Sequence, residues 1–300
     1  MTSLEVEIEG RSLALSNLEK DLYPAAGFTK GHVIDYYVRI APVLLPHYRG
    51  RPLTLKRYPD GVDGQFFYEK NCPSHRPPWV QTASVWTGLQ GKTIHYCLLE
   101  DLPTLAWVAN LAGLELHPSL GSVPHLEFAD SVVFDLDPGA PADVITCCRV
   151  AISLREALDG LGLVAAVKSS GSKGLQVYIP LNSETPYERT RAFALALARL
   201  LERDHPREVV SNMRKELRAG RVLIDWSQNH QQKTTIGVYS LRARERPTVS
   251  TPLSWDEVAA AAASGDPALV TFEAGDVLER VAARGDLFEE MVRRRQVLPG

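Results

Sequence analysis

Two aspartates one residue apart, Asp135 and Asp137, are the residues of this sequence with the clearest potential for chemistry. They end the apolar run 131–137, and because side chains of a strand alternate between faces, both carboxylates are expected on one side. Two converging carboxylates suit a hard divalent cation such as Mg²⁺ or Mn²⁺, which accepts substrate phosphates at its open positions. A solvated turn after a strand is the alternative, since the following Pro and Gly are common in turns.

A third acid, Asp225, follows the apolar residues 222–224 within the segment 221–226, which is typical of a buried strand. Three acids would suffice for two metal ions about 3.5–4 Å apart, the arrangement that polymerases and nucleases use for phosphoryl displacement. A cap of a helix or turn near Ser227 and Asn229 is the alternative role for Asp225. The three acids together favour metal binding.

The segment Lys168–Gly174 has the composition of a phosphate-binding loop. Its small residues let the backbone approach an anion, its hydroxyl groups can donate hydrogen bonds, and Lys173 adds positive charge. It is not a Walker A loop, because the spacing differs and the next residues, 175–179, are typical of a strand. A tight hairpin turn is the alternative.

Basic residues are concentrated around Asp225. Between Arg207 and Arg246 there are nine Lys or Arg and four Asp or Glu, although the chain has a formal net charge of −3. Local charge guides polyanions to a site more than the overall isoelectric point does. This segment therefore favours a phosphate-rich ligand.

Several motifs occur in a characteristic order: Val133–Gly139, Ser170–Gly174, Asp225–Asn229, and Lys233–Thr235 with Tyr239–Arg242. In this order they resemble the polymerase domain of bacterial ligase D, which belongs to the archaeo-eukaryotic primase superfamily and serves non-homologous end joining. The similarity runs from Leu15–Lys20 to the C-terminal region. It implies an α/β (mixed α+β) fold, with a primase-like catalytic core of mixed or antiparallel sheets flanked by helices.

The resemblance also implies roles for individual residues. Asp135, Asp137 and Asp225 would bind two Mn²⁺ or Mg²⁺ ions and act in catalysis, with Asp225 helping to activate the primer hydroxyl. The incoming nucleotide would be held by Lys56, His117, Ser170, Ser172, Lys173, Arg218, Gln228 and Arg242. Lys and Arg neutralise phosphate charge, and Ser and Gln donate hydrogen bonds without adding charge. From its sequence context alone, His117 would be a core histidine at the end of a strand.

The implied activity is template-directed addition of nucleotides, with a preference for ribonucleotides, to a 3′-hydroxyl at gaps or broken DNA ends. The implied partners are DNA with a 5′-phosphate, NTP or dNTP, a DNA ligase and the bacterial end-binding protein Ku. Asn17, Lys20 and Lys30 match the family's pocket for that 5′-phosphate. Thr29 is expected to cap a helix, and a helix start favours an anion. Ordinary surface lysines are the alternative.

Phe67 and Tyr68 match the residues that stack on template bases, a contact worth about 1–3 kcal/mol per base. The neighbouring Phe66 is expected in the core, and many family members have Phe where Tyr68 stands. A second departure is Gln176, because the family commonly has His there. Glutamine does not titrate, so no proton transfer is expected from this position.

Two other functions are compatible with parts of the sequence. Val133–Asp137 also resembles the first motif of haloacid-dehalogenase phosphatases, in which the first Asp is a nucleophile. That family needs a later acidic pair, whereas this chain has a basic segment. A non-catalytic module that binds DNA ends is the other alternative, and the three acids argue against it. An aspartyl-phosphate without nucleotide incorporation would indicate the phosphatase, and primer extension distinguishes the polymerase from the end-binding module.

The 300 residues are 45% hydrophobic, enough for a substantial core, and no linker, repeat or low-complexity tract divides them. We therefore expect one domain over residues 1–300. The N-terminus lacks the features of a signal peptide, and no apolar stretch is long enough for a membrane span. A cytoplasmic, nucleoid-associated protein is expected.

The four cysteines, Cys72, Cys97, Cys147 and Cys148, form neither a CxxC pair nor the framework of a secreted disulfide-rich protein. Free, buried thiols are therefore expected. Cys72 and His75 lie close in the sequence, but two ligands without partners are weak support for zinc, so no structural zinc is expected.

Hydrophobic periodicity predicts strands alternating with helices, which is typical of α/β or α+β proteins. The predicted strands are 53–58, 65–69, 94–98, 113–117, 131–135, 164–168, 175–179, 222–225 and 234–238. The predicted helices are 30–46, 102–112, 142–161, 187–203, 255–264 and 275–295.

Overall fold

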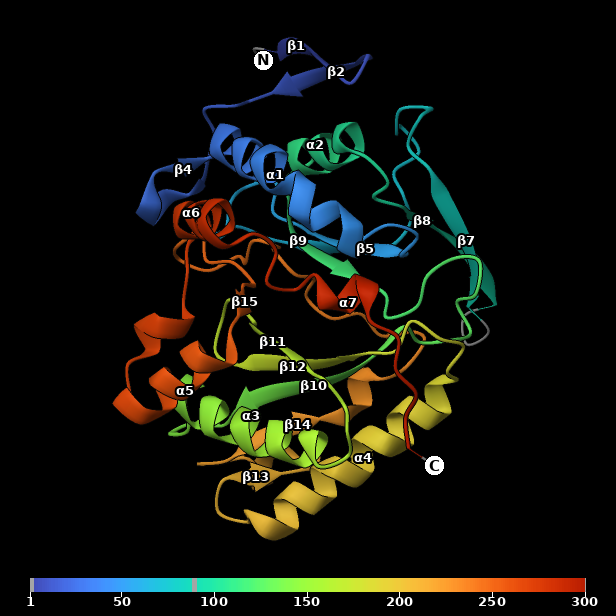
Figure 1. The fold of residues 1–300 in the computed structure, drawn as a ribbon. Helices are drawn as coiled ribbons and strands as arrows, with labels where there is room; N and C mark the ends of the chain where they lie inside the picture. The colour runs from blue at the N-terminus through green and yellow to red at the C-terminus, as the bar shows by residue number, and fades with distance from the viewer. Residues whose placement is uncertain (1–2, 88–90, 300) are drawn as a thin grey trace.

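The structure, a computed structural model, describes residues 3–87 and 91–299. Two sheets lie one above the other in Figure 1, with helices on their outer sides. This arrangement confirms the predicted mixed α/β class with mixed and antiparallel sheets flanked by helices.

The larger sheet has six strands, and only its first pair is parallel. In spatial order the strands are β13 (Val209–Val210), β14 (Val222–Asp225), β10 (Ser131–Pro138), β12 (Leu175–Pro180), β11 (Ala166–Ser169) and β15 (Pro252–Leu253). Its outer face packs on α3 (Val144–Asp159), α4 (Tyr187–Asp204) and α5 (Trp255–Ser264). Because side chains alternate, Val132, Phe134 and Leu136 enter this core, while Val133 enters the core beside the other sheet.

The smaller sheet contains β6 (Phe67–Glu69), β5 (Leu53–Arg57), β8 (Lys92–Cys97) and β7 (Thr82–Thr87), and β9 (Gly113–Pro118) also pairs with β5. Leu53, Leu55, Leu114 and Leu116 pack in one core with α1 (Lys30–Leu44) and α2 (Leu102–Asn110). The intervening residues of β5 and β9 therefore point towards the larger sheet.

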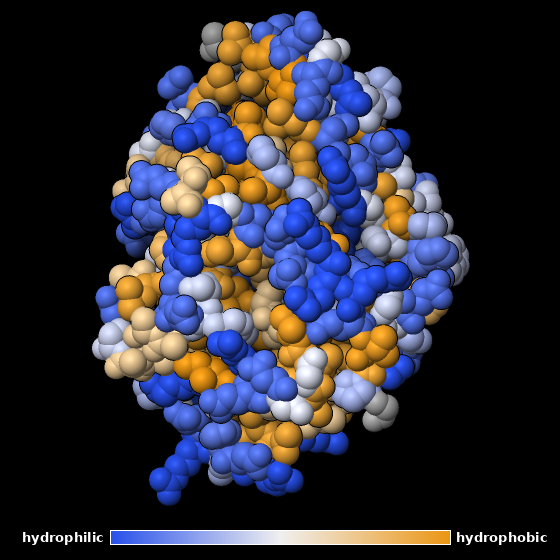
Figure 2. All heavy atoms as spheres, in the orientation of Figure 1, coloured by the Kyte–Doolittle hydropathy of each residue, from blue (hydrophilic) through white to orange (hydrophobic). Residues whose placement is uncertain are grey.

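The remaining elements lie at the periphery. Two small hairpins come first, made of β1 (Ser3–Ile8) with β2 (Arg11–Ser16) and of β3 (Asp21–Tyr23) with β4 (Phe28–Thr29). The C-terminal part contains α6 (Ala274–Arg284) and α7 (Glu290–Arg293). On the face seen in Figure 2, hydrophilic and hydrophobic residues are interspersed. In the described residues, no helix combines the length and apolarity that crossing a membrane would require.

Several local predictions are confirmed. Thr29 caps α1, where its hydroxyl accepts a hydrogen bond from the His32 amide at 3.4 Å. The helix predicted at 255–264 has those bounds, and the other predicted helices up to residue 204 differ by two residues or fewer at each end. The hairpin β1–β2 and strand β7 were not predicted.

Two predicted elements are wrong. Residues 234–238 do not form a regular strand, because their backbone groups bond singly to different partners: the Gly237 amide to Leu116 and the Ile236 carbonyl to Lys168. The helix predicted at 275–295 is divided in two, since α6 ends at Arg284 and is followed by Gly285, whose φ of 69° interrupts the helix.

The expectation of four free thiols is wrong for one pair, because Cys72 and Cys97 form a disulfide. Strand β8 places them together, and the Cys72 amide donates to the His95 carbonyl at 2.6 Å. A separation of 25 residues carries no local signal of this pairing. Cys147 and Cys148 are free and buried, as expected.

Candidate active site

A cavity of about 300 Å³, here called the central cavity, lies between the two sheets. Its walls include eight of the predicted site residues: His117, Asp135, Asp137, Ser170, Ser172, Lys173, Gln228 and Arg242. They come from β9, β10, the β11–β12 turn and two later segments. Folding therefore gathers residues that lie up to 125 positions apart, counted from His117 to Arg242.

The three acids are neighbours in the larger sheet. Asp135 and Asp137 occupy alternate positions of β10, so they share the face towards the smaller sheet. Asp225 lies directly opposite Asp135 on β14, and Gln176 lies opposite it on β12. Directly opposed residues of antiparallel strands project to the same face. The register of the sheet therefore places Asp225, Asp135 and Gln176 side by side on three neighbouring strands.

Asp135 is the acid most perturbed by this arrangement. Burial raises its pKa to about 6, and the nearby Asp225 and Asp137 contribute to the increase. A hydrogen bond from Gln176 Nε2 to Asp135 Oδ1, at 3.1 Å, opposes it. Carboxylates pushed together with a raised pKa are a common sign of a functional site.

Asp225 has a second role, which was the alternative predicted for it. Its Oδ1 accepts from the amide and hydroxyl of Ser227, and its Oδ2 accepts from Gln228 Nε2 at 3.0 Å. Asp225 thereby caps the short 3-10 helix Trp226–Gln228. Within residues 3–87 and 91–299, no three Asp, Glu, His or Cys side chains form a ready-made metal site.

The donor set nevertheless fits a hard divalent cation. Carboxylate oxygens are the preferred ligands of Mg²⁺ and Mn²⁺. The raised pKa of Asp135 means that its charge is poorly compensated by the protein. Arg218 is the nearest basic partner of Asp137, at 3.6 Å between Nη1 and Oδ2, and its own Nε is buried without a partner among the described residues.

The segment after β11 forms a tight turn, as its alternative interpretation predicted. Ser170 Oγ accepts hydrogen bonds from the amides of Ser172 and Gly174, at 3.3 and 3.2 Å. A Cβ atom at Gly174 would lie 1.9 Å from the Leu136 carbonyl oxygen, so only glycine fits against β10. The close approach holds the exposed Lys173 at the edge of the central cavity.

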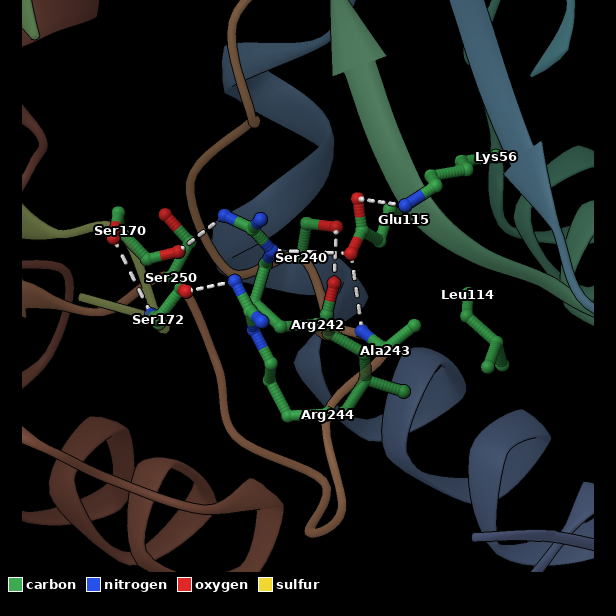
Figure 3. A network of polar contacts seen from close by, with 12 residues as sticks. Lys56, Leu114, Glu115, Ser170, Ser172, Ser240, Arg242, Ala243, Arg244 and Ser250 are labelled. Carbon is green, nitrogen blue, oxygen red and sulfur yellow. Dashed lines mark hydrogen bonds and ion pairs between the residues drawn. The ribbon is translucent and has the colours of Figure 1, made fainter. Parts of the chain in front are cut away.

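The opposite wall is organised by Glu115, which sequence reasoning missed. Its Oε1 accepts from Arg242 Nε and from the Ala243 amide, at 3.2 and 3.1 Å. Its Oε2 lies 3.0 Å from His117 Nε2 and 4.0 Å from Lys56 Nζ. Figure 3 shows this carboxylate between Lys56 and Arg242, with Arg242 reaching on to Ser170. Arg244 contacts Ser172 in the same network.

Glu115 stays ionised although it is buried. Burial alone would raise its pKa, but the hydrogen bond with His117 and the charge of Arg242 lower the pKa to about 2. Burial lowers the pKa of His117, and the positive charges of Arg242 and Lys56 add to this. One carboxylate therefore orients three side chains predicted to hold the nucleotide.

A buried lysine, Lys168, is the second residue that the sequence analysis missed. Its Nζ donates to Gln176 Oε1 and to Ser250 Oγ, both at 2.6 Å. Tyr178 also donates to Gln176 Oε1, at 3.3 Å. With its oxygen engaged, the Gln176 amide presents its NH₂ group to Asp135. Burial lowers the pKa of Lys168 to about 7. Gln176 thus acts as a fixed donor to Asp135.

The aromatic cluster differs from expectation at Phe66. This residue is 50% exposed rather than part of the core, because it lies before β6 with its ring against Lys56 Nζ, 4.0 Å from the ring centre. Phe67 and Tyr68 are exposed, as stacking on a template base would require, but consecutive strand residues face opposite sides. Tyr68 contacts the rings of Phe66 and His117, whereas Phe67 lies against Arg57.

The three residues predicted to bind a 5′-phosphate lie together at the N-terminal end of α1. Asn17 and Lys20 line a separate open cavity, and Lys20 Nζ contacts Asp60 at 2.8 Å. Lys30 is buried, not a surface lysine, and its Nζ donates to the Ser16 carbonyl at 2.6 Å. Burial, together with the charge of Lys20, lowers the pKa of Lys30 to about 8.

Several known proteins are similar to this chain in sequence. The "Multifunctional non-homologous end joining protein LigD" of Mycolicibacterium smegmatis is 42% identical over 280 residues, covering 91% of this chain and 35% of the relative. The "Bifunctional non-homologous end joining protein LigD" of Bacillus subtilis is 32% identical over 288 residues, covering 96% of this chain and 45% of the relative. The chain thus spans less than half the length of these curated relatives.

The fold gives the same result. The "Polymerase Domain from Mycobacterium tuberculosis Ligase D in complex with DNA" matches with a TM-score of 0.87 and 40% identity, covering 95% of this chain and 99% of that chain. The family model described as "LigD, primase-polymerase domain" matches residues 29–288. The chain therefore belongs to the LigD primase-polymerase domain family.

Proposed function

We propose that this protein adds nucleotides, directed by a template, to a 3′-hydroxyl at gaps or broken DNA ends. The observation that carries this proposal is the pairing of Asp135 on β10 with Asp225 on β14, beside a cavity that Asp135 lines together with Lys173 and Arg242. Ribonucleotides are the expected preferred substrates, and a DNA ligase and Ku the expected partners. The DNA-bound structure of the similar mycobacterial domain supports DNA as the substrate.

In this proposal the two halves of the cavity divide the work. Asp135, Asp137 and Asp225 hold the divalent ions, which stabilise the attacking and leaving oxygens of an in-line displacement. The nucleotide's phosphates face His117, Ser170, Ser172, Lys173 and Arg242 in the cavity wall. Lys56 adds charge beside Glu115, while Arg218 and Gln228 contact the phosphates from beside Asp137 and Asp225. Glu115 positions the side chains that bind the phosphates, and Gln176 positions Asp135. Phe67 or Tyr68 stacks on the template.

Primer extension tests the proposal. Wild-type protein should extend a primer across a gap that carries a downstream 5′-phosphate, with Mn²⁺ or Mg²⁺ and with NTP or dNTP. If the protein binds DNA ends but extends no primer, the polymerase function is rejected and a non-catalytic end-binding module is supported. An aspartyl-phosphate intermediate without nucleotide incorporation would instead support a phosphatase.

Metal affinity is expected to depend on pH through Asp135. Protons and metal ions compete for this carboxylate, whose pKa is raised to about 6. Between pH 7 and pH 5 the apparent Kd for Mn²⁺ should therefore increase by about tenfold, measured as free Mn²⁺ by electron paramagnetic resonance. Asp135→Asn should remove this step. An affinity that stays constant across the range would contradict the role of Asp135.

Selectivity for a downstream 5′-phosphate is expected to depend on Lys20 and Lys30. A lysine–phosphate hydrogen bond contributes about 1.5–3 kcal/mol, so Lys20→Gln with Lys30→Met should reduce the preference for phosphorylated strands at least tenfold. Methionine replaces the buried Lys30 without a cavity. Lys215→Gln, an exposed lysine in another region, is the matched control. Preference is measured as the ratio of extension rates, and an unchanged ratio would reject this pocket.

A further inference from the structure

A second cavity, here called the side cavity, adjoins the central cavity and has no role in the function described so far. It measures about 180 Å³ and is bounded by β5, β7, β8 and the segment 231–234. We infer that it binds an unpaired nucleobase of the template strand, next to the base that pairs with the incoming nucleotide. The inference rests on the proposed polymerase function.

A buried hydroxyl group points to a ligand in the side cavity. Thr54 is 2% exposed and lines the cavity, yet its Oγ1 has no hydrogen-bond partner among the described residues. A buried polar group without a partner costs about 1–3 kcal/mol. A hydroxyl group both donates and accepts, so it can bond to the edge of any base. Thr54 therefore suits a ligand that has a polar edge.

The other walls suit a flat aromatic ligand. Trp86 is 65% exposed, and its neighbours in the lining include Ile94 and Tyr96. Aromatic side chains stack on nucleobases regardless of sequence, because every base has a π face. Gln231 and Gln232 add amide groups that can bond to base edges. Lys70 is the one Lys or Arg among the described lining residues, which suits the backbone phosphate of one nucleotide rather than a triphosphate.

The position of the side cavity identifies the strand. Thr54 lies opposite His117 in the β5–β9 pairing and two residues before Lys56, so all three are on the face that looks towards the larger sheet, and His117 lines the central cavity. Thr234 lines both cavities. A strand that crosses Tyr68 can therefore place successive bases in the two cavities. The side cavity continues the proposed template path.

A template labelled with 2-aminopurine at successive unpaired positions tests this inference. The fluorescence should change at one position on binding, and an abasic site there should weaken template binding on the order of tenfold. Trp86→Ala should abolish the position-specific signal. Thr54→Val should weaken binding several-fold at that position, while the free protein keeps or gains thermal stability, because valine removes an unpaired hydroxyl at constant shape. Thr82→Val, on β7 but outside the lining, is the control.

The outcomes separate this inference from the polymerase proposal. Wild-type protein that extends primers but gives the same fluorescence at every position would overturn the side-cavity site alone. Template binding as tight as that of the wild type in both Thr54→Val and Trp86→Ala would also overturn the side-cavity site. If a free nucleoside binds in the side cavity but no position of the labelled strand gives a signal, the template strand is rejected as the occupant. Failure of the wild type to extend any primer would reject the polymerase proposal itself.

Discussion

Replacing Asp135 with Asn is expected to slow nucleotide addition by at least about a thousandfold, because the metal ions supply several kcal/mol of transition-state stabilisation and each 1.36 kcal/mol is a factor of ten. Asparagine keeps the shape and the contact with Gln176 but removes the charge. DNA binding should be nearly unchanged. Single-turnover extension and fluorescence anisotropy measure the two effects.

The same change is expected to stabilise the metal-free protein at neutral pH. Because the pKa of Asp135 is raised to about 6, the native state binds its proton more tightly than the unfolded chain does. The stabilisation that this bound proton gives is therefore complete below pH 4, near the ordinary pKa of an aspartate, and it is lost as the pH rises through 6. Asp135→Asn should raise the Tm at pH 7.5 and not at pH 4, as measured by calorimetry.

A second cavity variant and a surface control accompany the Asp135 prediction. Asp137 is exposed, so Asp137→Asn tests the metal role where folding is not at risk. Asp159→Asn, at the exposed end of α3, should leave extension unchanged. Extension within tenfold of wild type by both cavity variants would contradict the assignment of these acids.

Replacing Arg242 with Gln is expected to raise the KM for the incoming nucleotide roughly a hundredfold, because a guanidinium–phosphate interaction with two hydrogen bonds contributes about 3 kcal/mol or more. Arg242 already bonds Glu115 through Nε and the Ser170 carbonyl through Nη1, at 2.7 Å for the latter. These bonds fix its orientation, and its remaining donors are available for phosphate. Steady-state kinetics with varied nucleotide measure the change.

Controls separate nucleotide binding from folding. Arg242→Lys keeps the charge but loses the planar fork, so it should recover only part of the affinity. Arg246→Gln removes an exposed arginine of the same segment that pairs with Glu273, and should change KM less than twofold or so. Circular dichroism and DNA affinity should match wild type for all three. An unchanged KM in Arg242→Gln would contradict its contact with the nucleotide.

The sequence by itself determined the features that depend on neighbours along the chain. The alternation of β10 places Asp135 and Asp137 on one face while Phe134 and Leu136 enter the core, and this period of two is visible in the residues. Thr29 as a helix cap and the main helices follow from similarly local patterns. The order of the motifs predicted the family, which the comparisons confirm.

Only the tertiary structure decided which distant residues became partners. The register of β10 against β14 and β12 places Asp225 and Gln176 on either side of Asp135, and Lys168 behind Gln176. The central role of Glu115 and the Cys72–Cys97 disulfide have the same origin. A buried charge or thiol has an ordinary appearance in the sequence, because its energy depends on the charges and donors that folding brings to it from other strands.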